Sequence, residues 1–224
     1  MFIKEKIKKL LIFYIPGLLT FAFNCFCYLS PGLIIAPENY IHINTPVDDM
    51  LPLVPAFLLF YFGSYLQWFL YYIEQNDLDN EETYRVFMGE MIGKTICWLC
   101  FVFFPVTLRR PEITGHSFFD LILKLTYRID KPCCLFPSIH CFQSWMHLRF
   151  CRKHRSTKIT LPVALFTIGV FASTVLIKQH LLMDIAGGVL VAEFGQFVSN
   201  RCDLYLKFES FCKKIRERLT DKLL

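Results

Sequence analysis

Residues 159–200 read ITLPVALFTIGVFASTVLIKQHLLMDIAGGVLVAEFGQFVSN, and this stretch decides the class of fold. It holds two apolar runs, 159–178 and 181–200, with the polar residues Lys178, Gln179 and His180 at the break between them. Each run has the roughly 20 residues that an α-helix needs to cross the ~30 Å hydrocarbon core of a bilayer. The stretch therefore predicts two membrane-spanning helices joined by a sharp turn at the membrane face.

The rest of the chain continues this pattern. Of its 224 residues, 54% are hydrophobic and only 19% are charged, which is too little charge for a soluble domain of this size. Four further apolar stretches predict spans at about 10–30, 51–73, 86–106 and 137–151. We therefore expect an all-α fold, a six-transmembrane helical bundle. The first stretch is as long as a full span, and no small-residue cleavage site follows it, so it predicts a retained helix rather than a signal peptide.

The sequence divides into a basic N-terminal segment, 1–9, a membrane domain, 10–200, and a basic tail, 201–224. Basic residues also cluster at 152–158, and six spans place all three basic segments on one side. The positive-inside rule makes that side cytoplasmic. We therefore expect an integral, multi-pass membrane protein with cytoplasmic N- and C-termini. Apolar and basic residues recur at near-helical spacing in the tail from Phe208 to Leu224, which suits either a helix on the anionic inner leaflet or a solvated helix.

His180 and Asp184 are four residues apart and so share one face of a helix. A carboxylate in that position can bond one ring nitrogen and leave the other as a nucleophile or base. Ser173 lies seven residues before His180, on the same face if the helix continues. Gly187 and Gly188 follow and permit close helix packing behind these residues.

His140 follows Pro137 and Ser138, two residue types that suit a helix start. The free backbone N–H groups of a helix N-terminus form a cradle for phosphate, and a protonated His140 one turn in can supply a proton to a leaving oxygen. Arg110 and Lys178, with Lys131 as a weaker candidate, add positive charge. In the six-span topology all these residues fall on the extracytoplasmic face, which predicts an anionic ligand there.

The ten cysteines suggest little chemistry. Cys97 and Cys100 have the spacing of half a metal or redox site, but they lie within an apolar run and have no second pair at a useful distance. We interpret them as buried small hydrophobic residues. Cys133 and Cys134 lie in a loop beside the His140 motif, and we assign them no chemistry.

These motifs resemble those of the type-2 phosphatidic acid phosphatase superfamily. That family has a Lys followed by Arg-Pro, then Pro-Ser-Gly-His, then Ser-Arg followed by a His and an Asp four residues apart. The matching stretches are Arg109-Arg110-Pro111, Pro137-Ser138-Ile139-His140, and Ser173-Thr174 with His180 and Asp184. The resemblance covers about residues 85–195.

Three positions depart from the family pattern, where Phe103, Ile139 and Thr174 replace the family Lys, Gly and Arg. The runs Arg-Pro-Glu-Ile-Thr-Gly, Phe-Pro-Ser-x-His and Lys-Gln-His are similar to the branch that contains inositol phosphorylceramide synthases. In that branch Lys178 is a candidate to replace the missing third-motif arginine.

The resemblance implies a mechanism. His180 would attack phosphorus and form a phosphohistidine, Asp184 would orient it, and His140 would protonate the leaving alkoxide. The phosphate would be held by Arg110, Ser138, the backbone of Ile139, Lys178 and Ser173, with Lys131 as a further candidate. The scheme needs no metal and no cofactor. The implied partners are a lipid phosphate or diphosphate substrate and the bilayer, without nucleic acid, and the oligomeric state stays open.

We therefore expect a lipid phosphate or diphosphate phosphatase, because hydrolysis needs only water as acceptor. A lipid headgroup phosphotransferase is the alternative, and it shares the same chemistry. A transporter or scaffold would show polar residues at mid-membrane depth, whereas the candidates above lie at span ends. A metal site made of His140, His180 and Asp184 has a known ligand pattern, but nearby Arg and Lys side chains would repel a cation.

Overall fold

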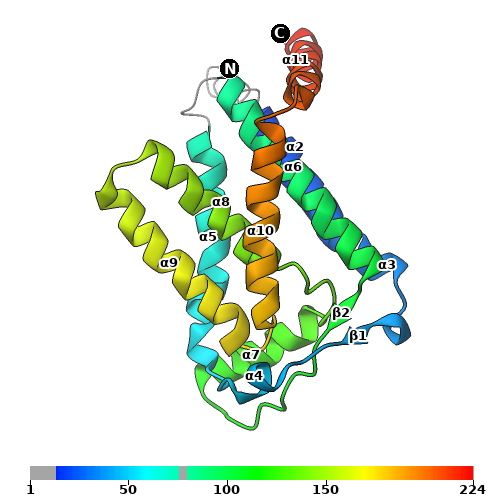
Figure 1. Cartoon of the computed structure of the whole chain (residues 1–224), viewed down its shortest axis with the longest axis vertical. Coiled ribbons are helices and arrows are strands. Elements are labelled where there is room, and N and C mark those ends of the chain that lie inside the picture. The colour runs from blue at the N-terminus through cyan, green and yellow to red at the C-terminus, as the bar shows by residue number, and fades with distance from the viewer. Residues whose placement is uncertain (1–13, 76–79, 224) are drawn as a thin grey trace.

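Long helices run side by side between two ends of the molecule (Figure 1). The structure, a computed structural model, describes residues 14–75 and 80–223, so the expected N-terminal segment 1–9 lies outside the described residues. The bundle consists of α2 (Ile15–Leu29), α5 (Leu58–Glu74), α6 (Asn80–Phe103), α8 (Ile139–His154), α9 (Thr157–Leu176) and α10 (Leu182–Ser199). The expectation of an all-α fold is confirmed.

Five stretches of the described chain are helical, long and apolar enough to cross a membrane: Ile15–Ile34, Pro55–Glu74, Glu81–Phe103, Thr157–Leu176 and Leu182–Ser199. They match five of the six expected spans, although α6 begins at Asn80, earlier than expected. The first span ends in the short α3 (Pro31–Ile34), and the second begins with η2 (Pro55–Phe57). These apolar helices indicate a membrane protein.

The stretch expected as the fourth span, 137–151, forms α8, which does not belong to those five. Its 16 residues extend about 24 Å at 1.5 Å per residue, less than the hydrocarbon core. Gln143, Ser144 and His147 are buried within it. α8 packs against α5, α9 and α10, so protein surrounds it and its polar side chains face neighbouring helices.

Glycines let α10 lie very close to its neighbours. A Cβ built on Gly188 would stand 2.6 Å from the backbone oxygen of Ser138, at the start of α8. A Cβ on Gly195 would stand 2.3 Å from the backbone oxygen of Gly89 in α6. The close packing that the sequence predicts at Gly187 and Gly188 is therefore present, and it fixes the start of α8 against α10.

One end of the bundle carries short elements that sequence patterns did not predict. These are η1 (Pro37–Asn39), β1 (Ile41–His42), α4 (Pro46–Met50), β2 (Val106–Thr107) and α7 (Phe118–Ile129). β1 pairs with β2 in parallel, Ile41 opposite Val106. The segment 107–136, expected as a loop, contains α7, which begins with a capping box between Ser117 and Asp120.

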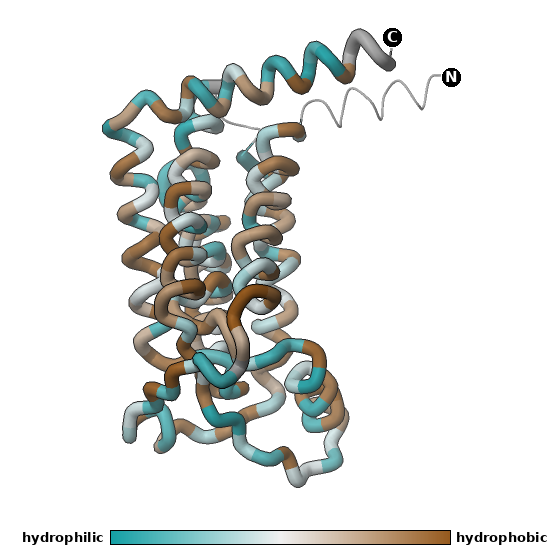
Figure 2. Tube along the Cα trace, turned by 90° about the vertical axis from the view of Figure 1, so that its right-hand side faces the viewer, coloured by the Kyte–Doolittle hydropathy of each residue, from teal (hydrophilic) through white to brown (hydrophobic). Residues whose placement is uncertain are grey.

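At the opposite end, α11 (Leu204–Leu223) lies across the bundle rather than along it (Figure 2). Tyr205, Phe208 and Cys212 pack against residues of α2 and α6, while Leu206 and Phe211 stay exposed. The tail is therefore helical, with apolar residues both packed against the bundle and exposed. The turn between α8 and α9 lies toward this same end (Figure 1).

Candidate active site

His180 stands in the turn between α9 and α10. The backbone oxygen of Thr174, in the last turn of α9, accepts hydrogen bonds from the N–H groups of Gln179 and His180, both at 2.9 Å. Lys178 takes a left-handed conformation, with φ of 52°, to make this turn. The expected sharp turn therefore exists, and it places His180 two residues before Leu182, the first residue of α10.

Asp184 contacts His180 as the four-residue spacing predicts. His180 Nδ1 lies 3.2 Å from Asp184 Oδ2 and 3.1 Å from the backbone oxygen of Leu135. Asp184 Oδ2 also accepts the N–H of Leu181 at 2.8 Å, which fixes the carboxylate. Both neighbours of Nδ1 are acceptors, so Nδ1 carries the proton in the neutral ring and Nε2 keeps its lone pair.

His140 lies in the first turn of α8. Ser138 caps this helix, and its hydroxyl accepts the N–H of Cys141. His140 Nδ1 lies 3.1 Å from the Oγ of Ser64 in α5. The Ser64 hydroxyl already donates to the backbone oxygen of Tyr61 at 2.6 Å, so toward His140 it accepts. His140 therefore also carries a proton on Nδ1.

Aromatic side chains of α5 enclose His140. The Tyr61 ring stacks on it at 4.2 Å between centroids, and Trp68 lies at 4.9 Å. The His140 and His180 rings are 6.1 Å apart. Among the described residues, no hydrogen-bond partner occupies the Nε2 of either ring. The two imidazoles are thus held on their Nδ1 sides, and each keeps Nε2 for other chemistry.

Two cavities meet at His180. The first, which we call the aromatic cavity, has a volume of about 170 Å³ and is lined mainly by aromatic residues of α2 and α5 together with His140, Lys131, Cys133 and Gln179. The second, which we call the cationic cavity, has a volume of about 460 Å³ and is lined by Arg109, Arg110, Lys178 and residues of the β1–α4 segment. His180 therefore has a space with aromatic walls on one side and, on the other, a space lined by three cationic side chains and by Asp48 and Asp49.

Arg110 is held by three carbonyl-type oxygens. Its Nη1 donates to the backbone oxygens of Tyr127 and Asp130, and its Nη2 donates to the side chain of Gln179. Burial lowers the pKa of Arg110 below its usual value, and Asp130 opposes that shift. The Nε–H is buried and has no partner among the described residues. Nε–H and a hydrogen on Nη2 form the pair of donors with which arginine binds a phosphate oxygen pair.

The other expected phosphate ligands are placed differently. Lys178 lines the cationic cavity, but its Nζ donates to the backbone oxygen of Asp48 at 2.6 Å. Lys131 is exposed and lines the aromatic cavity. Ile139 is the first residue of α8 and lines the same cavity. The structure thus brings these three residues to the two spaces around His180.

Ser138 and Ser173 line neither cavity. Ser138 is fully buried, and its N–H donates to the backbone oxygen of Asp184 at 3.1 Å. The hydroxyl of Ser173 donates to the backbone oxygen of Val170 at 2.7 Å. Ser173 lies within α9, and the turn at Lys178 breaks the helix before His180, so the two residues do not share a continuous helical face.

Several residues of this site were missed in the sequence. Ser64 and Tyr61 lie inside the apolar stretch 51–73, where the available signal is a polar serine within an apolar run. Gln179 belongs to the Lys-Gln-His run, but its spacing predicted no role for it. Its Nε2 is buried without a partner among the described residues. Asp48 anchors the α4 segment, because its Oδ1 accepts the N–H of Leu182 at 2.8 Å. That bond, with those from Thr45, outweighs the effect of burial and lowers the pKa of Asp48.

In the alternative metal site, the ligand atoms of His140, His180 and Asp184 do not face a common point. Asp184 lies on the Nδ1 side of His180, away from the Nε2 side, and Ser64 occupies Nδ1 of His140. The Asp184 carboxylate therefore orients the His180 ring and does not face the position where one metal ion could bind both imidazoles.

No family model matches the chain, and neither a curated protein nor a solved structure matches it. The class that the fold defines is thus an α-helical protein whose apolar helices suit a membrane.

Proposed function

We propose that the protein is an integral membrane phosphatase that hydrolyses lipid phosphates or diphosphates through a phosphohistidine. The observation that supports this is the His140–His180 pair, with ring centroids 6.1 Å apart and the proton of each ring fixed on Nδ1. An oriented imidazole with a free Nε2 is a nucleophile, and a second imidazole nearby is an acid or base.

In the proposed reaction, Nε2 of His180 attacks phosphorus. The bond from phosphorus to the ester oxygen breaks, and the protonated His140 transfers its Nε2 proton to that oxygen. His140 is then a base and takes a proton from a water molecule, whose oxygen attacks the phosphohistidine. The P–N bond breaks, phosphate leaves, and both rings return to their starting states. Asp184 stabilises the positive charge that develops on His180 in the first step.

Positive charge near His180 suits the phosphoryl group. The unpaired Nε–H of Arg110 and the Nε2 of Gln179 are buried donors that lack partners among the described residues. Such donors gain most when an anion binds them, because an unpaired buried polar group costs about 1–3 kcal/mol. The aromatic cavity would take the apolar part of the lipid, and the cationic cavity the polar part.

The same proposal includes the topology. α8 would be the fourth of six transmembrane helices, with both termini in the cytoplasm and the site at the extracytoplasmic face. It also includes the likeness to the type-2 phosphatidic acid phosphatase superfamily, whose motif positions fall on His140, His180 and Asp184.

A headgroup phosphotransferase is the alternative within this chemistry. A cavity of about 460 Å³ beside His180 is far larger than one water molecule needs. It would hold a polar acceptor whose hydroxyl replaces water in the second step. Assays therefore need acceptor alcohols as well as water.

The test is phosphate release from a panel of lipid phosphates and diphosphates by the purified protein in detergent with chelator. We expect release in the presence of chelator, loss of release in His180→Ala and His140→Ala, and a strong reduction in Asp184→Asn. Glu193→Gln is the matched control, since Glu193 also lies on α10 but pairs with Arg149. If no lipid releases phosphate and no added alcohol accepts it, the proposal fails.

One observation favours a second candidate, ion-coupled transport. Glu90 and Lys94, one turn apart in α6, are both fully buried. Tyr72 donates to Glu90, whereas Glu90 Oε2 and Lys94 Nζ have no hydrogen-bond partner among the described residues. Buried ionisable residues within a membrane helix often mark ion pathways, and Glu90 and Lys94 lie within the expected span 86–106 rather than at a span end.

Proteoliposomes loaded with a pH-sensitive dye test this candidate. Proton flux under an imposed pH gradient that Glu90→Gln abolishes would support transport. Flux equal to that of empty liposomes would exclude transport. Phosphate release by the same Glu90→Gln protein would assign the function to the histidine site.

A further inference from the structure

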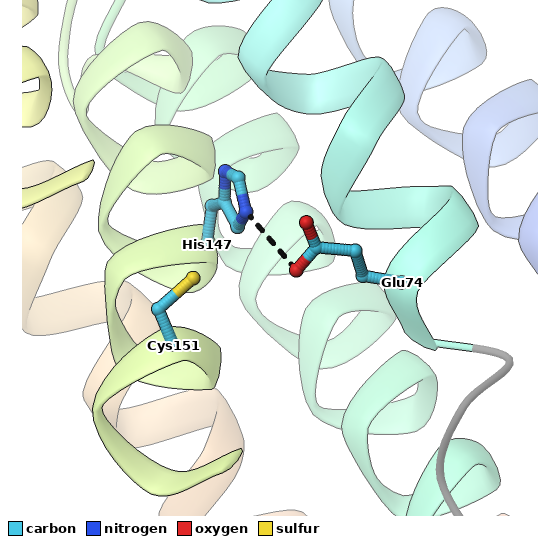
Figure 3. A group of neighbouring side chains, drawn as sticks. All are labelled: Glu74, His147 and Cys151. Carbon is cyan, nitrogen blue, oxygen red and sulfur yellow. Dashed lines mark ion pairs between the residues drawn. The ribbon is translucent and has the colours of Figure 1, made fainter. Parts of the chain in front are cut away.

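A second cluster of chemically active side chains lies away from the candidate active site. Glu74 is the last residue of α5, and His147 and Cys151 lie one turn apart on α8. All three side chains point toward one another (Figure 3). One potential ligand atom from each residue lies within 4.8 Å of the others, and no other such group occurs among the described residues.

His147 lacks the partners that a buried histidine needs. Its side chain is 3% exposed, and neither ring nitrogen makes a hydrogen bond within the described part of the chain. Its Nε2 lies 3.6 Å from Glu74 Oε2, which is too long for a hydrogen bond. Glu74 Oε2 is also buried without a hydrogen bond. A ligand bound between the two side chains would satisfy one ring nitrogen of His147 and this oxygen, whose other charged neighbour is Arg155, 3.5 Å away.

From these contacts we infer that Glu74, His147 and Cys151 form a zinc-binding site that joins α5 to α8. Imidazole, thiolate and carboxylate are the ligands that Zn²⁺ takes in proteins, and three protein ligands leave a fourth position for water. Tetrahedral zinc with bonds of about 2.0–2.3 Å holds its ligand atoms about 3.5 Å apart. The present spacing therefore requires only a small contraction of the three side chains.

Arg155 is a cation beside this site, with Nε 3.5 Å from Glu74 Oε2. Binding of Zn²⁺ displaces the Cys151 thiol proton, so the thiolate and carboxylate together balance the two positive charges of the ion. Arg155 then faces a neutral centre, and it can keep its contact with the carboxylate. The guanidinium would act as an outer partner of Glu74 rather than as a competitor.

The placement suggests what the ion would do. His147 lies seven residues after His140, two turns along the same helix. α5 supplies the Ser64 hydroxyl and the Tyr61 ring that hold His140. A zinc ion between Glu74 and His147 would therefore brace the two helices whose contact positions His140, and it would take no part in the reaction.

Cobalt is the probe for the test, because Co²⁺ occupies zinc sites and a thiolate ligand gives it a charge-transfer absorption band. The full chain in detergent is stripped with chelator and titrated with Co²⁺. We expect the thiolate band to saturate at a single equivalent, to disappear when Zn²⁺ is added, and to be absent in Cys151→Ser. His147→Ala and Glu74→Gln should raise the Co²⁺ concentration needed for half-saturation at least tenfold.

The control is the double variant Cys133→Ser and Cys134→Ser, which removes two adjacent thiols outside the Glu74, His147 and Cys151 group and should keep the full band. X-ray absorption of the zinc-loaded wild-type protein requires no variant to fold, and it should show one sulfur ligand among nitrogen and oxygen ligands. Absence of a thiolate band in the wild type, a band that survives in Cys151→Ser, or a zinc spectrum without sulfur would each overturn the site.

Discussion

Ser64 accepts a hydrogen bond from His140 across 3.1 Å, and this contact joins α5 to the start of α8. On the other side of the cavity, Asp184 and the Leu135 carbonyl hold His180 in the same tautomer. Both rings therefore direct their reactive nitrogens away from their supports. The site is assembled from α5, α8 and the turn before α10, three parts of the chain that are distant in sequence.

Ser64→Ala tests this support directly. The change leaves the His140 Nδ1–H buried without an acceptor, which costs about 1–3 kcal/mol, so we expect kcat to fall roughly tenfold. The protonated ring loses more than the neutral ring, so the alkaline limb of the pH–rate profile should move to lower pH. Steady-state phosphate release across pH measures both effects.

Ser199→Ala is the matched control for this prediction. Ser199 is equally buried, and its hydroxyl donates to the backbone oxygen of Arg85 at 2.6 Å, near the other end of α10. It should change stability without moving the pH profile. An unchanged profile in Ser64→Ala would mean that Ser64 only fills space beside His140.

The contacts that sequence reasoning predicted are local ones. His180 and Asp184 are four residues apart, and Ser138 caps the helix it begins, so spacing alone was sufficient. The Ser64–His140 bond joins residues 76 positions apart. Nothing in an apolar run says which of its faces meets which helix, so this partner required the structure.

The same limit explains the differences in the fold. Hydropathy predicted five of the spans because long apolar runs are a strong signal. α8 gave an ambiguous signal because protein surrounds it, so it can bury Gln143 and His147 where lipid would not accept them. α7 was not predicted, although Ser117 and Asp120 form a capping box at its start, because its 12 residues are too short to give a membrane-spanning apolar run.

Arg110→Lys should lower kcat/KM more than the retained positive charge would suggest. Lysine keeps the positive charge, but its three donors cannot bind the oxygens of Tyr127, Asp130 and Gln179 and also present two donors to a phosphate. The loss of one charge-assisted hydrogen bond, about 1.5–3 kcal/mol, predicts a fall in kcat/KM of roughly 10- to 150-fold. Inhibition by inorganic phosphate should weaken in parallel.

Arg109→Lys provides the comparison, because Arg109 lines the same cavity and is exposed. Its kcat/KM should stay within about twofold, as expected for an exposed charge. Equal losses in the two variants would show that the cavity needs charge alone and not the Arg110 fork.

Cys133 should react with iodoacetamide at a pH where an ordinary thiol is slow. Hydrogen bonds from Cys134 and Tyr40 lower the pKa of Cys133 to about 7, although burial acts in the opposite direction. The thiolate is the reactive form, so the alkylation rate should rise up to about pH 7 and then level off. A cysteine peptide with a pKa of about 8.5 should keep accelerating beyond pH 8.

Peptide mapping by mass spectrometry measures this rate at Cys133, and Tyr40→Phe is the variant that isolates its cause. Removing the Tyr40 hydroxyl should move the midpoint of the rate profile upward. A Cys133 profile that follows the peptide through pH 8 would contradict the prediction. Because Cys133 lines the aromatic cavity, its alkylation should also block phosphate release.

Gly188→Ala should destabilise the protein through the start of α8. The added Cβ would lie 2.6 Å from the Ser138 oxygen and 3.0 Å from the Phe142 nitrogen. Both are backbone atoms, so relief requires α8 to shift, at a cost of about 1–3 kcal/mol. The midpoint of thermal unfolding in detergent should fall by several degrees. Gly32→Ala is the control, because its Cβ would meet only Cys133 Sγ at 3.8 Å, an ordinary contact.

A shift of α8 also moves His140, so phosphate release by Gly188→Ala should fall at temperatures where the variant is still folded. Full activity in a folded Gly188→Ala protein would show that the position of His140 tolerates movement of its helix.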